Sequence, residues 1–125
     1  MTRLSAIRQI SVNAHDLPRA IAFYRDTLGL HHLFDAPPQM SFFDCGGIRL
    51  LLGVAEKAEF DHRSSILYFA VDDIGRAHRD LKERGVKFRD EPHLVAKLPG
   101  REIWLSFFED SEGNVLALNS EIAAS

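Results

Sequence analysis

The sequence predicts an α+β fold made of two βαβββ modules, each with one strand, one helix and three further strands. Three observations lead to this prediction. Apolar and polar residues alternate in short segments, helical apolar spacing follows an aspartate in two places, and the segments recur along the chain. The stretch "DLPRA" at Asp16 returns as "DIGRA" at Asp73, and "SFFD" at Ser41 returns as "SFFE" at Ser106. Such a repeat indicates two copies of one supersecondary unit.

The first module is expected at residues 6–54, beginning with a strand at Ile7–Val12. A helix follows because Asp16 can cap the free amides, Pro18 suits a first turn, and Gly29 can take the left-handed conformation that ends a helix. The later strands are expected at Leu30–Phe34, Gln39–Asp44 and Ile48–Val54, with turns at Pro37-Pro38 and Gly46-Gly47.

The second module is expected at residues 64–120, after a polar linker at residues 55–63. Its first strand is Ile66–Val71, Asp72 or Asp73 caps the helix, and Gly85 ends it. The apolar stripe of this helix includes His78, for which a partly buried, structural role is expected. The later strands are expected at Val86–Arg89, Ile103–Glu109 and Asn114–Asn119.

Composition narrows the classes of partner. The 125 residues are enough for one domain with a buried core, and the single Cys45 has no intrachain partner, which is typical of a reducing compartment such as the cytoplasm. The net charge is −3 and the Lys and Arg residues are scattered, so nucleic-acid binding is not expected. No apolar run reaches the roughly 18 residues that span a bilayer, and no membrane partner is expected. Small molecules and protein partners remain.

Three stretches resemble the vicinal oxygen chelate superfamily, which includes glyoxalase I, methylmalonyl-CoA epimerase, extradiol dioxygenases and bleomycin-resistance proteins. They are "ISVNAHDLPRAIAFYRDTLGL", "LYFAVDDIGRAHRDLKERGV" and "FFEDSEGNVLAL", and the resemblance covers nearly the whole chain. It implies a curved mixed sheet around a central cup, with the helices on the outer face. Many members hold a divalent metal in this cup, and members of this kind usually form homodimers. We therefore expect a homodimer.

The resemblance also locates the four metal-ligand positions, and none carries a usual ligand. The first-strand histidine falls on Gln9, and its counterpart in the second module is Ile66. The last-strand glutamate falls on Ala117, whose counterpart is Leu51, although a slip of two residues would select Arg49 instead. Hydrocarbon side chains offer no lone pairs to a metal. We therefore expect no family-type metal cofactor, with a divalent metal bound at other positions as the alternative.

Strand alternation then predicts which other side chains line the cup. Arg49 is the most informative, because a guanidinium matches the geometry of a carboxylate or phosphate; the alternative is a solvated or ion-paired side chain. The predicted ligand-binding set from the strands is Gln9, Ser11, Asn13, Arg49, Leu51, Ile66, Tyr68, Ala117 and Asn119.

Two residues near the penultimate strand complete the predicted site. His93, expected on a loop, is the candidate catalytic residue, because a histidine beside a cup can act as a general base near neutral pH; a surface histidine is the alternative. Trp104 is a candidate stacking surface for a ligand, with core packing as the alternative, because the strand face on which it lies is not fixed by the sequence.

Three functions are compatible with these features. The first, which we favour, is a metal-free binding protein for a small, partly aromatic or anionic molecule. The second is a lyase, isomerase or epimerase that uses His93 for proton transfer, with Arg49 or Gln9 stabilising an enolate oxygen, or a metal at non-family positions. The third is a protein that acts through its surface and has lost the use of its cup.

Overall fold

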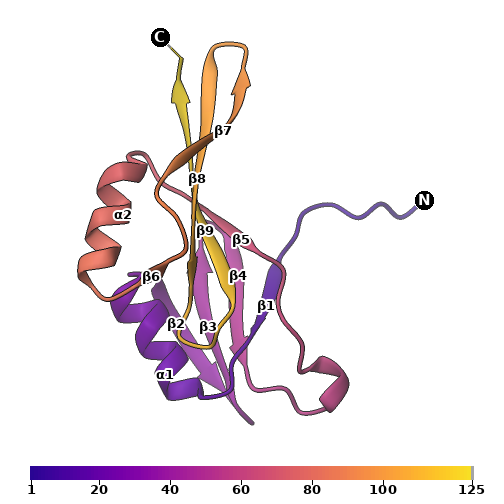
Figure 1. Cartoon of the computed structure of the whole chain (residues 1–125). Helices are drawn as coiled ribbons and strands as arrows, with labels where there is room; N and C mark the ends of the chain where they lie inside the picture. The colour runs from indigo at the N-terminus through magenta and orange to yellow at the C-terminus, as the bar shows by residue number, and fades with distance from the viewer. Residues whose placement is uncertain (125) are drawn as a thin grey trace. The chain divides into compact units, whose positions relative to one another are not determined.

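The computed structural model describes residues 1–124 and divides the chain into two compact units (Figure 1). The first comprises residues 1–64, and the second begins at Ser65. Each unit contains its own mixed β-sheet and one principal helix, as the predicted α+β fold requires. Among the described residues, no helix combines the length and apolar character needed to cross a bilayer.

The first unit has a four-stranded sheet with the order β1-β4-β3-β2. Strand β1 runs parallel to β4, and the β3 pairings with β2 and β4 are antiparallel. The parallel pair requires a crossover, which the helical segment after β1 provides. The strands are β1 (Gln9–Asn13), β2 (His31–Ala36), β3 (Met40–Cys45) and β4 (Ile48–Gly53).

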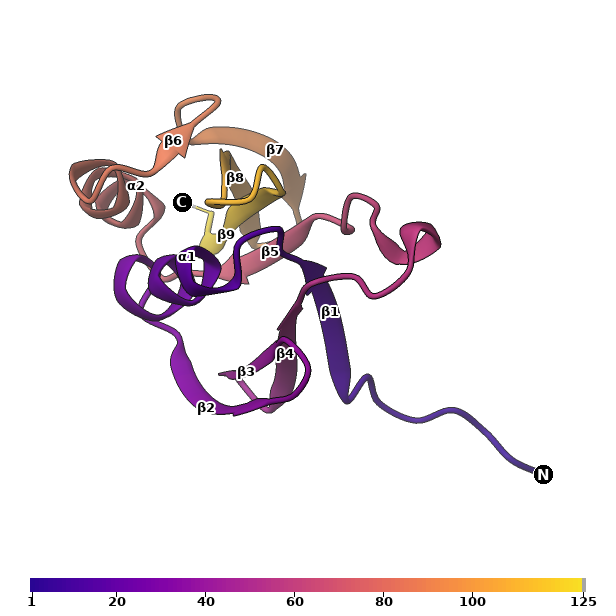
Figure 2. The same ribbon diagram turned by 90° about the horizontal axis from the view of Figure 1, so that it is seen from below.

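Helix α1 (Leu17–Ala22) begins as predicted, because the side chain of Asp16 accepts a hydrogen bond from the backbone N–H of Arg19. The helix then continues as a π-helical segment, η1 (Phe23–Thr27), where the sequence predicted one uninterrupted helix. Figure 2 shows α1 on one side of the sheet formed by β2, β3 and β4. Gly29 ends the segment with a φ of 79°, which is the left-handed conformation expected there.

The second unit has a five-stranded sheet with the order β5-β9-β8-β6, and β7 also pairs with β8. Helix α2 (Ile74–Glu83) is capped by Asp73 and packs on β8 and β9. Figure 1 shows the β7–β8 hairpin and the end of β9 extending together beyond α2. The strands are β5 (Leu67–Ala70), β6 (Lys87–Phe88), β7 (His93–Leu98), β8 (Arg101–Glu109) and β9 (Val115–Ala123).

Each sheet has a helix face and an opposite face, which we call the open face. In the first unit Tyr24 packs on Phe43, so Phe43, Leu50 and Leu52 belong to the helix face and form its buried core. In the second unit the ring of His78 on α2 approaches Ser106 on β8, which assigns Ser106 and its neighbours Phe108 and Leu118 to the helix face. The alternate residues on every strand therefore occupy the open faces.

Two strand predictions need correction. Strand β7 was not predicted, and His93, expected on a loop, is its first residue; the segment pairs antiparallel with β8 across a turn at Pro99-Gly100. The first strand starts at Gln9 instead of Ile7, because the register of β4 pairs Arg49 with Gln9 and leaves Ile7 65% exposed. A strand needs a partner as well as apolar alternation.

Candidate functional site

The open face of the first unit carries a row of side chains that crosses all four strands. The backbone register pairs Gln9 of β1 with Arg49 of β4, and Phe42 of β3 with Phe34 of β2. Arg49 Nε donates a hydrogen bond to Gln9 Oε1 at 2.8 Å. The Arg49 guanidinium carbon lies 5.5 Å from the centroid of the Phe42 ring, which itself stacks on Phe34 with centroids 4.5 Å apart. The row thus holds a cation between an amide and an aromatic stack.

No acidic side chain within residues 1–124 forms an ion pair with Arg49. Asp44 is its cross-strand partner on β3, but the Asp44 carboxylate accepts a hydrogen bond from the backbone N–H of Gly47 in the β3–β4 turn. The Asp44 carboxylate is thus used to shape the turn. Two neutral groups, the Gln9 amide and the Phe42 ring, orient the Arg49 guanidinium. The ion-paired arginine that the sequence left as an alternative is not found within residues 1–124.

A pocket of about 270 Å³ opens beside this row. Three residues of the predicted ligand-binding set line it, namely Ser11, Asn13 and Leu51. Phe60, whose side chain is 57% exposed, supplies an aromatic wall from the linker after β4. The remaining lining is mostly apolar and includes Pro38, Met40, Gly53, Val54 and Ala55, with Glu56 as the charged member. A concave apolar surface with a few polar groups is typical of small-molecule sites.

The linker is held at this pocket by hydrogen bonds from Asn13. The Asn13 side-chain nitrogen donates to Asp61 Oδ1 and to the carbonyl of His62, each at 3.0 Å, and its backbone N–H donates to Ser64 Oγ. Asp61 Oδ1 also lies 2.8 Å from Nε2 of His15. Asn13, predicted as a ligand contact, therefore also positions the linker that carries Phe60. The sequence did not show this, because the partners lie about 50 positions further along the chain.

The family-type metal does not fit the residues present. In the first unit the oxygen of Gln9 is engaged by a guanidinium, and the corresponding position on β4 is the hydrocarbon Leu51. In the second unit the two corresponding positions are Ile66 and Ala117, which have no metal-binding atoms. Within residues 1–124, His, Cys, Asp and Glu side chains do not gather in any group of three that could hold a metal ion.

On the open face of the second unit, Tyr68 and Phe107 flank Ala117 in the neighbouring strands. Their ring centroids are only 6.1 Å apart, with an edge-to-face geometry, although a strand separates them. The rings therefore lean toward each other over the methyl group of Ala117, which is 0% exposed. Ala117 was predicted to contact a ligand; the structure corrects this, because its side chain is buried. Tyr68 stays 51% exposed.

His93 lies on the same open face, because it pairs with Leu105 and its ring stacks on Phe107 with centroids 6.4 Å apart. Its Nδ1 is 3.0 Å from the carbonyl oxygen of Glu91 and 3.5 Å from Asp90 Oδ2. A carbonyl can only accept, so Nδ1 carries a hydrogen, and in the neutral ring Nε2 then presents a lone pair. The orienting partners that a general base needs are thus present, which the sequence alone did not reveal.

Trp104 does not belong to this open face. It pairs with Ser120 and alternates with Ser106 and Phe108, which assigns it to the helix face, where its ring nitrogen donates to Glu102 Oε1 at 3.2 Å. The prediction of Trp104 as a ligand-stacking residue is therefore corrected. The register places Asn119 on the open face, as predicted, where it is half-buried. Ile66 lies just before β5 and is exposed.

A Ser, His and Asp also meet on the helix side of the first unit. His32 Nε2 lies 2.7 Å from Asp35 Oδ1 and 2.9 Å from Ser41 Oγ. A catalytic triad uses the two different ring nitrogens for the acid and the hydroxyl, whereas here one nitrogen contacts both. Hydrogen bonds from Ser41 and then His32 lower the pKa of Asp35. The group is a structural network.

The thiol of Cys45 is also unsuited to catalysis. Burial, reinforced by the charge of Asp44, raises its pKa, and the protonated thiol is a poor nucleophile. His78 is buried, at 4% exposed; its Nδ1 bonds to Ser106, while Nε2 lies 3.3 Å from Glu91 Oε2 without hydrogen-bond geometry. His78 is thus buried, as expected, but only one of its two ring nitrogens has a hydrogen-bond partner among the described residues.

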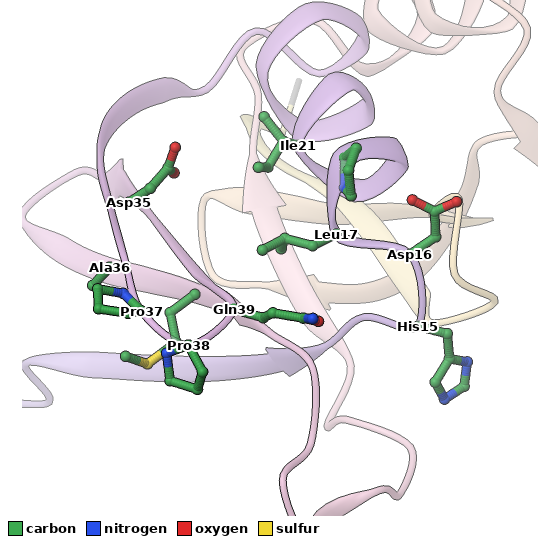
Figure 3. A pocket seen from close by; sticks show the side chains of 11 residues that line it. His15, Asp16, Leu17, Ile21, Asp35, Ala36, Pro37, Pro38 and Gln39 are labelled. Carbon is green, nitrogen blue, oxygen red and sulfur yellow. The ribbon is translucent and has the colours of Figure 1, made fainter.

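A larger hollow, of about 720 Å³, lies where α1 begins and where β2 turns into β3 (Figure 3). Pro38 and Met40 belong to both this hollow and the smaller pocket, so the β2–β3 turn contributes to each. Its two carboxylates already have hydrogen-bond partners, since Asp16 caps α1 and Asp35 bonds to His32. It contains none of the predicted ligand-binding residues, and we place the candidate site at the smaller pocket.

Comparison with known proteins assigns the chain to a family. A family model described as the Glyoxalase/Bleomycin resistance protein/Dioxygenase superfamily matches residues 6–118. An uncharacterized protein, YraH of Bacillus subtilis (strain 168), is 26% identical over 123 residues, which cover 88% of this chain and 94% of that protein. Among the solved structures that resemble this chain, two match it over nearly their whole length.

The first of these structures is TnmS3, an antibiotic binding protein from Streptomyces sp. CB03234. It is 27% identical with a TM-score of 0.77, and the match covers 96% of this chain and 98% of TnmS3. The second is a lactoylglutathione lyase from Agrobacterium tumefaciens. It is 25% identical with a TM-score of 0.68, and the match covers 95% of this chain and 96% of the lyase. One relative is thus a binding protein and the other an enzyme.

Proposed function

Because the chain belongs to the Glyoxalase/Bleomycin resistance protein/Dioxygenase superfamily, we propose that it binds a small molecule at the open face of its first unit without a family-type metal. The observation that carries this proposal is the pocket lined by Ser11, Leu51 and Phe60. Its volume of about 270 Å³ lies near the lower end for ligand sites, which suits a molecule built around a single ring. The likeness to TnmS3, an antibiotic binding protein, supports a binding role.

The residues that line the pocket support a class of ligand. Phe60 and Leu51 offer an aromatic wall and an aliphatic floor, so a flat apolar ring removes apolar surface from water on both sides. Ser11 supplies a hydroxyl that can donate or accept a hydrogen bond. The neighbouring Arg49 accounts for the anionic component of the predicted ligand.

The proposal is tested by ligand-observed NMR with a library of single-ring compounds and chelator-treated protein. We expect hits that shift the backbone amides of Ser11 and Leu51. The substitution Phe60→Ala should weaken these hits about fivefold or more, the loss of roughly 1 kcal/mol of aromatic contact. Because Phe60 is largely exposed, this variant should keep the native amide spectrum.

Leu98→Ala is the matched control, because Leu98 is an exposed apolar residue of β7 that does not line the pocket. It should leave the affinities unchanged. The pocket is not the ligand site if the hits shift the amide signals of neither Ser11 nor Leu51. The same conclusion follows if the hits bind Phe60→Ala as tightly as the wild type.

The orientation of His93 favours a second candidate function, proton transfer at a carbon next to a carbonyl. Nδ1 is fixed by Glu91 and Asp90, and Nε2 is left to accept the proton, which produces an enolate. Asn119 lies on the same open face, and its amide could donate to the enolate oxygen. The likeness to a lactoylglutathione lyase is compatible with this chemistry.

Deuterium exchange separates this candidate from simple binding. Carbonyl-containing hits from the library are incubated with the protein in deuterated water, and loss of the adjacent proton signal is followed by NMR. Proton transfer by His93 predicts exchange that stops in His93→Gln and continues in the control His31→Gln, an exposed histidine on β2. Exchange at equal rates in both variants would remove His93 as the base.

A further inference from the structure

Gln9 stands at a position where metal-using members of the superfamily carry a ligand, and in this chain it binds a cation that belongs to the protein. The Arg49 Nε–H donates to Gln9 Oε1 at 2.8 Å, and the two residues are Cα partners on β1 and β4. An amide oxygen that accepts from a guanidinium faces a positive charge, which disfavours a second cation at the same atom. The same contact fixes the guanidinium of Arg49 at this place.

A second contact restricts the orientation of Arg49. Its guanidinium carbon is 5.5 Å from the centroid of Phe42, and Phe42 is itself held by stacking on Phe34. Held by an amide on one side and a ring on the other, the guanidinium has little side-chain freedom left to lose when it binds a ligand. Its planar fork matches two oxygens of a carboxylate or phosphate.

The charge of Arg49 is also not neutralised by another side chain. Within the described part of the chain, the side-chain contacts of Arg49 are to Gln9 and Phe42, and the nearby carboxylate of Asp44 accepts from the Gly47 amide. The two terminal nitrogens of the guanidinium are therefore available to an oxyanion. A fixed cation beside apolar surface attracts such a group more strongly than a solvated one.

The guanidinium adjoins the pocket. Leu51 and Ser11 line the pocket, and each follows Arg49 or Gln9 by two residues on the same strand face. Two residues of a strand span about 7 Å, so one small molecule can place a ring in the pocket and an oxyanion at Arg49.

We propose that Arg49, held by Gln9, replaces the superfamily's metal ion as the positive charge that binds the ligand's oxygens. The ligand is then a ring that carries a carboxylate or a phosphate. This inference rests on the proposed function, since it uses the same pocket for the ring.

Three probes of similar size test the inference: benzoate, phenyl phosphate and the neutral benzamide. Each is titrated into chelator-treated protein while the Arg49 Nε–H signal and the amides of Ser11 and Leu51 are followed by NMR. We expect at least one anion to shift the Arg49 signal and to bind about tenfold or more tightly than benzamide. The tighter of the two anions identifies carboxylate or phosphate as the natural group.

Variants at position 49 separate charge from shape. Arg49→Gln should lower the affinity for both anions to that for benzamide. Arg49→Lys should recover part of the lost affinity, because it keeps the positive charge but lacks the planar guanidinium. The control Arg8→Gln removes an equal charge next to Gln9 in the chain and should leave all three affinities unchanged.

The failure of this inference can be told apart from failure of the proposed function. The role of Arg49 is overturned if the anions bind no more tightly than benzamide, or if their higher affinity persists in Arg49→Gln. It is also overturned if no probe shifts the Arg49 Nε–H signal. If benzamide or the library hits still shift the amide signals of Ser11 and Leu51, the proposed ligand binding in the pocket holds even though Arg49 has no part in it.

Discussion

Ala117 carries a methyl group where the resemblance to metal-using members of the superfamily would place a glutamate. Two aromatic rings lean over this methyl group from the neighbouring strands. A small side chain is required under this ring pair, because a fully buried site has no room for a longer one. The sequence predicted the missing ligand but not the burial, which depends on where Tyr68 and Phe107 point.

Restoring the glutamate should therefore destabilise the protein instead of restoring a metal site. Ala117→Glu forces a carboxylate into a filled, apolar space, and we expect the free energy of unfolding to fall by about 3 kcal/mol or more. Urea denaturation measures this. Ala70→Glu on the exposed end of β5 is the control and should change stability by less than about 0.5 kcal/mol. A stable Ala117→Glu protein that binds zinc would show that the space around Ala117 can still accommodate a metal ligand.

The Asp35 carboxylate provides a second prediction for a single residue. Hydrogen bonds from Ser41 and His32 stabilise its charged form, so its pKa is lower in the folded chain than in the unfolded chain. Its contribution to stability is therefore present above the unfolded pKa and disappears as the pH falls through the folded value. In Ser41→Ala, a carbon-detected NMR titration should show the pKa of Asp35 shifted upward.

Ser111→Ala provides the comparison, because Ser111 bonds to Glu112 in another unit and should leave the Asp35 titration unchanged. An unaltered Asp35 pKa in Ser41→Ala would mean that the hydroxyl does not stabilise the carboxylate.

At the scale of elements, the helix starts follow directly from local chemistry. Asp73 caps α2 by accepting from the Arg76 amide, as Asp16 does for α1. We expect Asp73→Ala to lower the free energy of unfolding by about 1 kcal/mol, measured by urea denaturation, with faster amide exchange in the first turn of α2. Asp80→Ala, which removes a carboxylate from the middle of the same helix, should cost less than about 0.5 kcal/mol. Equal effects of the two substitutions would exclude capping as the cause.

The elements that the sequence missed depend on partners distant in the chain. Strand β7 has little alternation of its own, and it forms because the Pro99-Gly100 turn brings it beside β8. The Pro-Gly pair between two apolar stretches was the signal that could have revealed this hairpin. The strand face of Trp104 was equally undetermined until the contact between His78 and Ser106 showed which side of β8 meets α2.

At the scale of the whole molecule, the internal repeat was the most informative feature of the sequence. It predicted two similar βαβββ modules, each with one capped helix, and the family match over residues 6–118 agrees with that fold. The structure gives each unit a mixed sheet of its own. The site was predicted less completely. Alternation placed Gln9, Arg49, Leu51 and Ser11 on one face, but the contribution of Phe60 depends on linker contacts that no local pattern encodes. The homodimer and the cytoplasmic location remain predictions.

We propose that the chain binds its ligand with its own side chains and not through a metal. The most direct test is calorimetric titration of the best ring-containing hit into chelator-treated protein, repeated after addition of zinc, nickel, manganese or iron(II). We expect measurable binding without metal and dissociation constants that agree within about twofold under all conditions. Binding that appears only after one of these ions is added would contradict it.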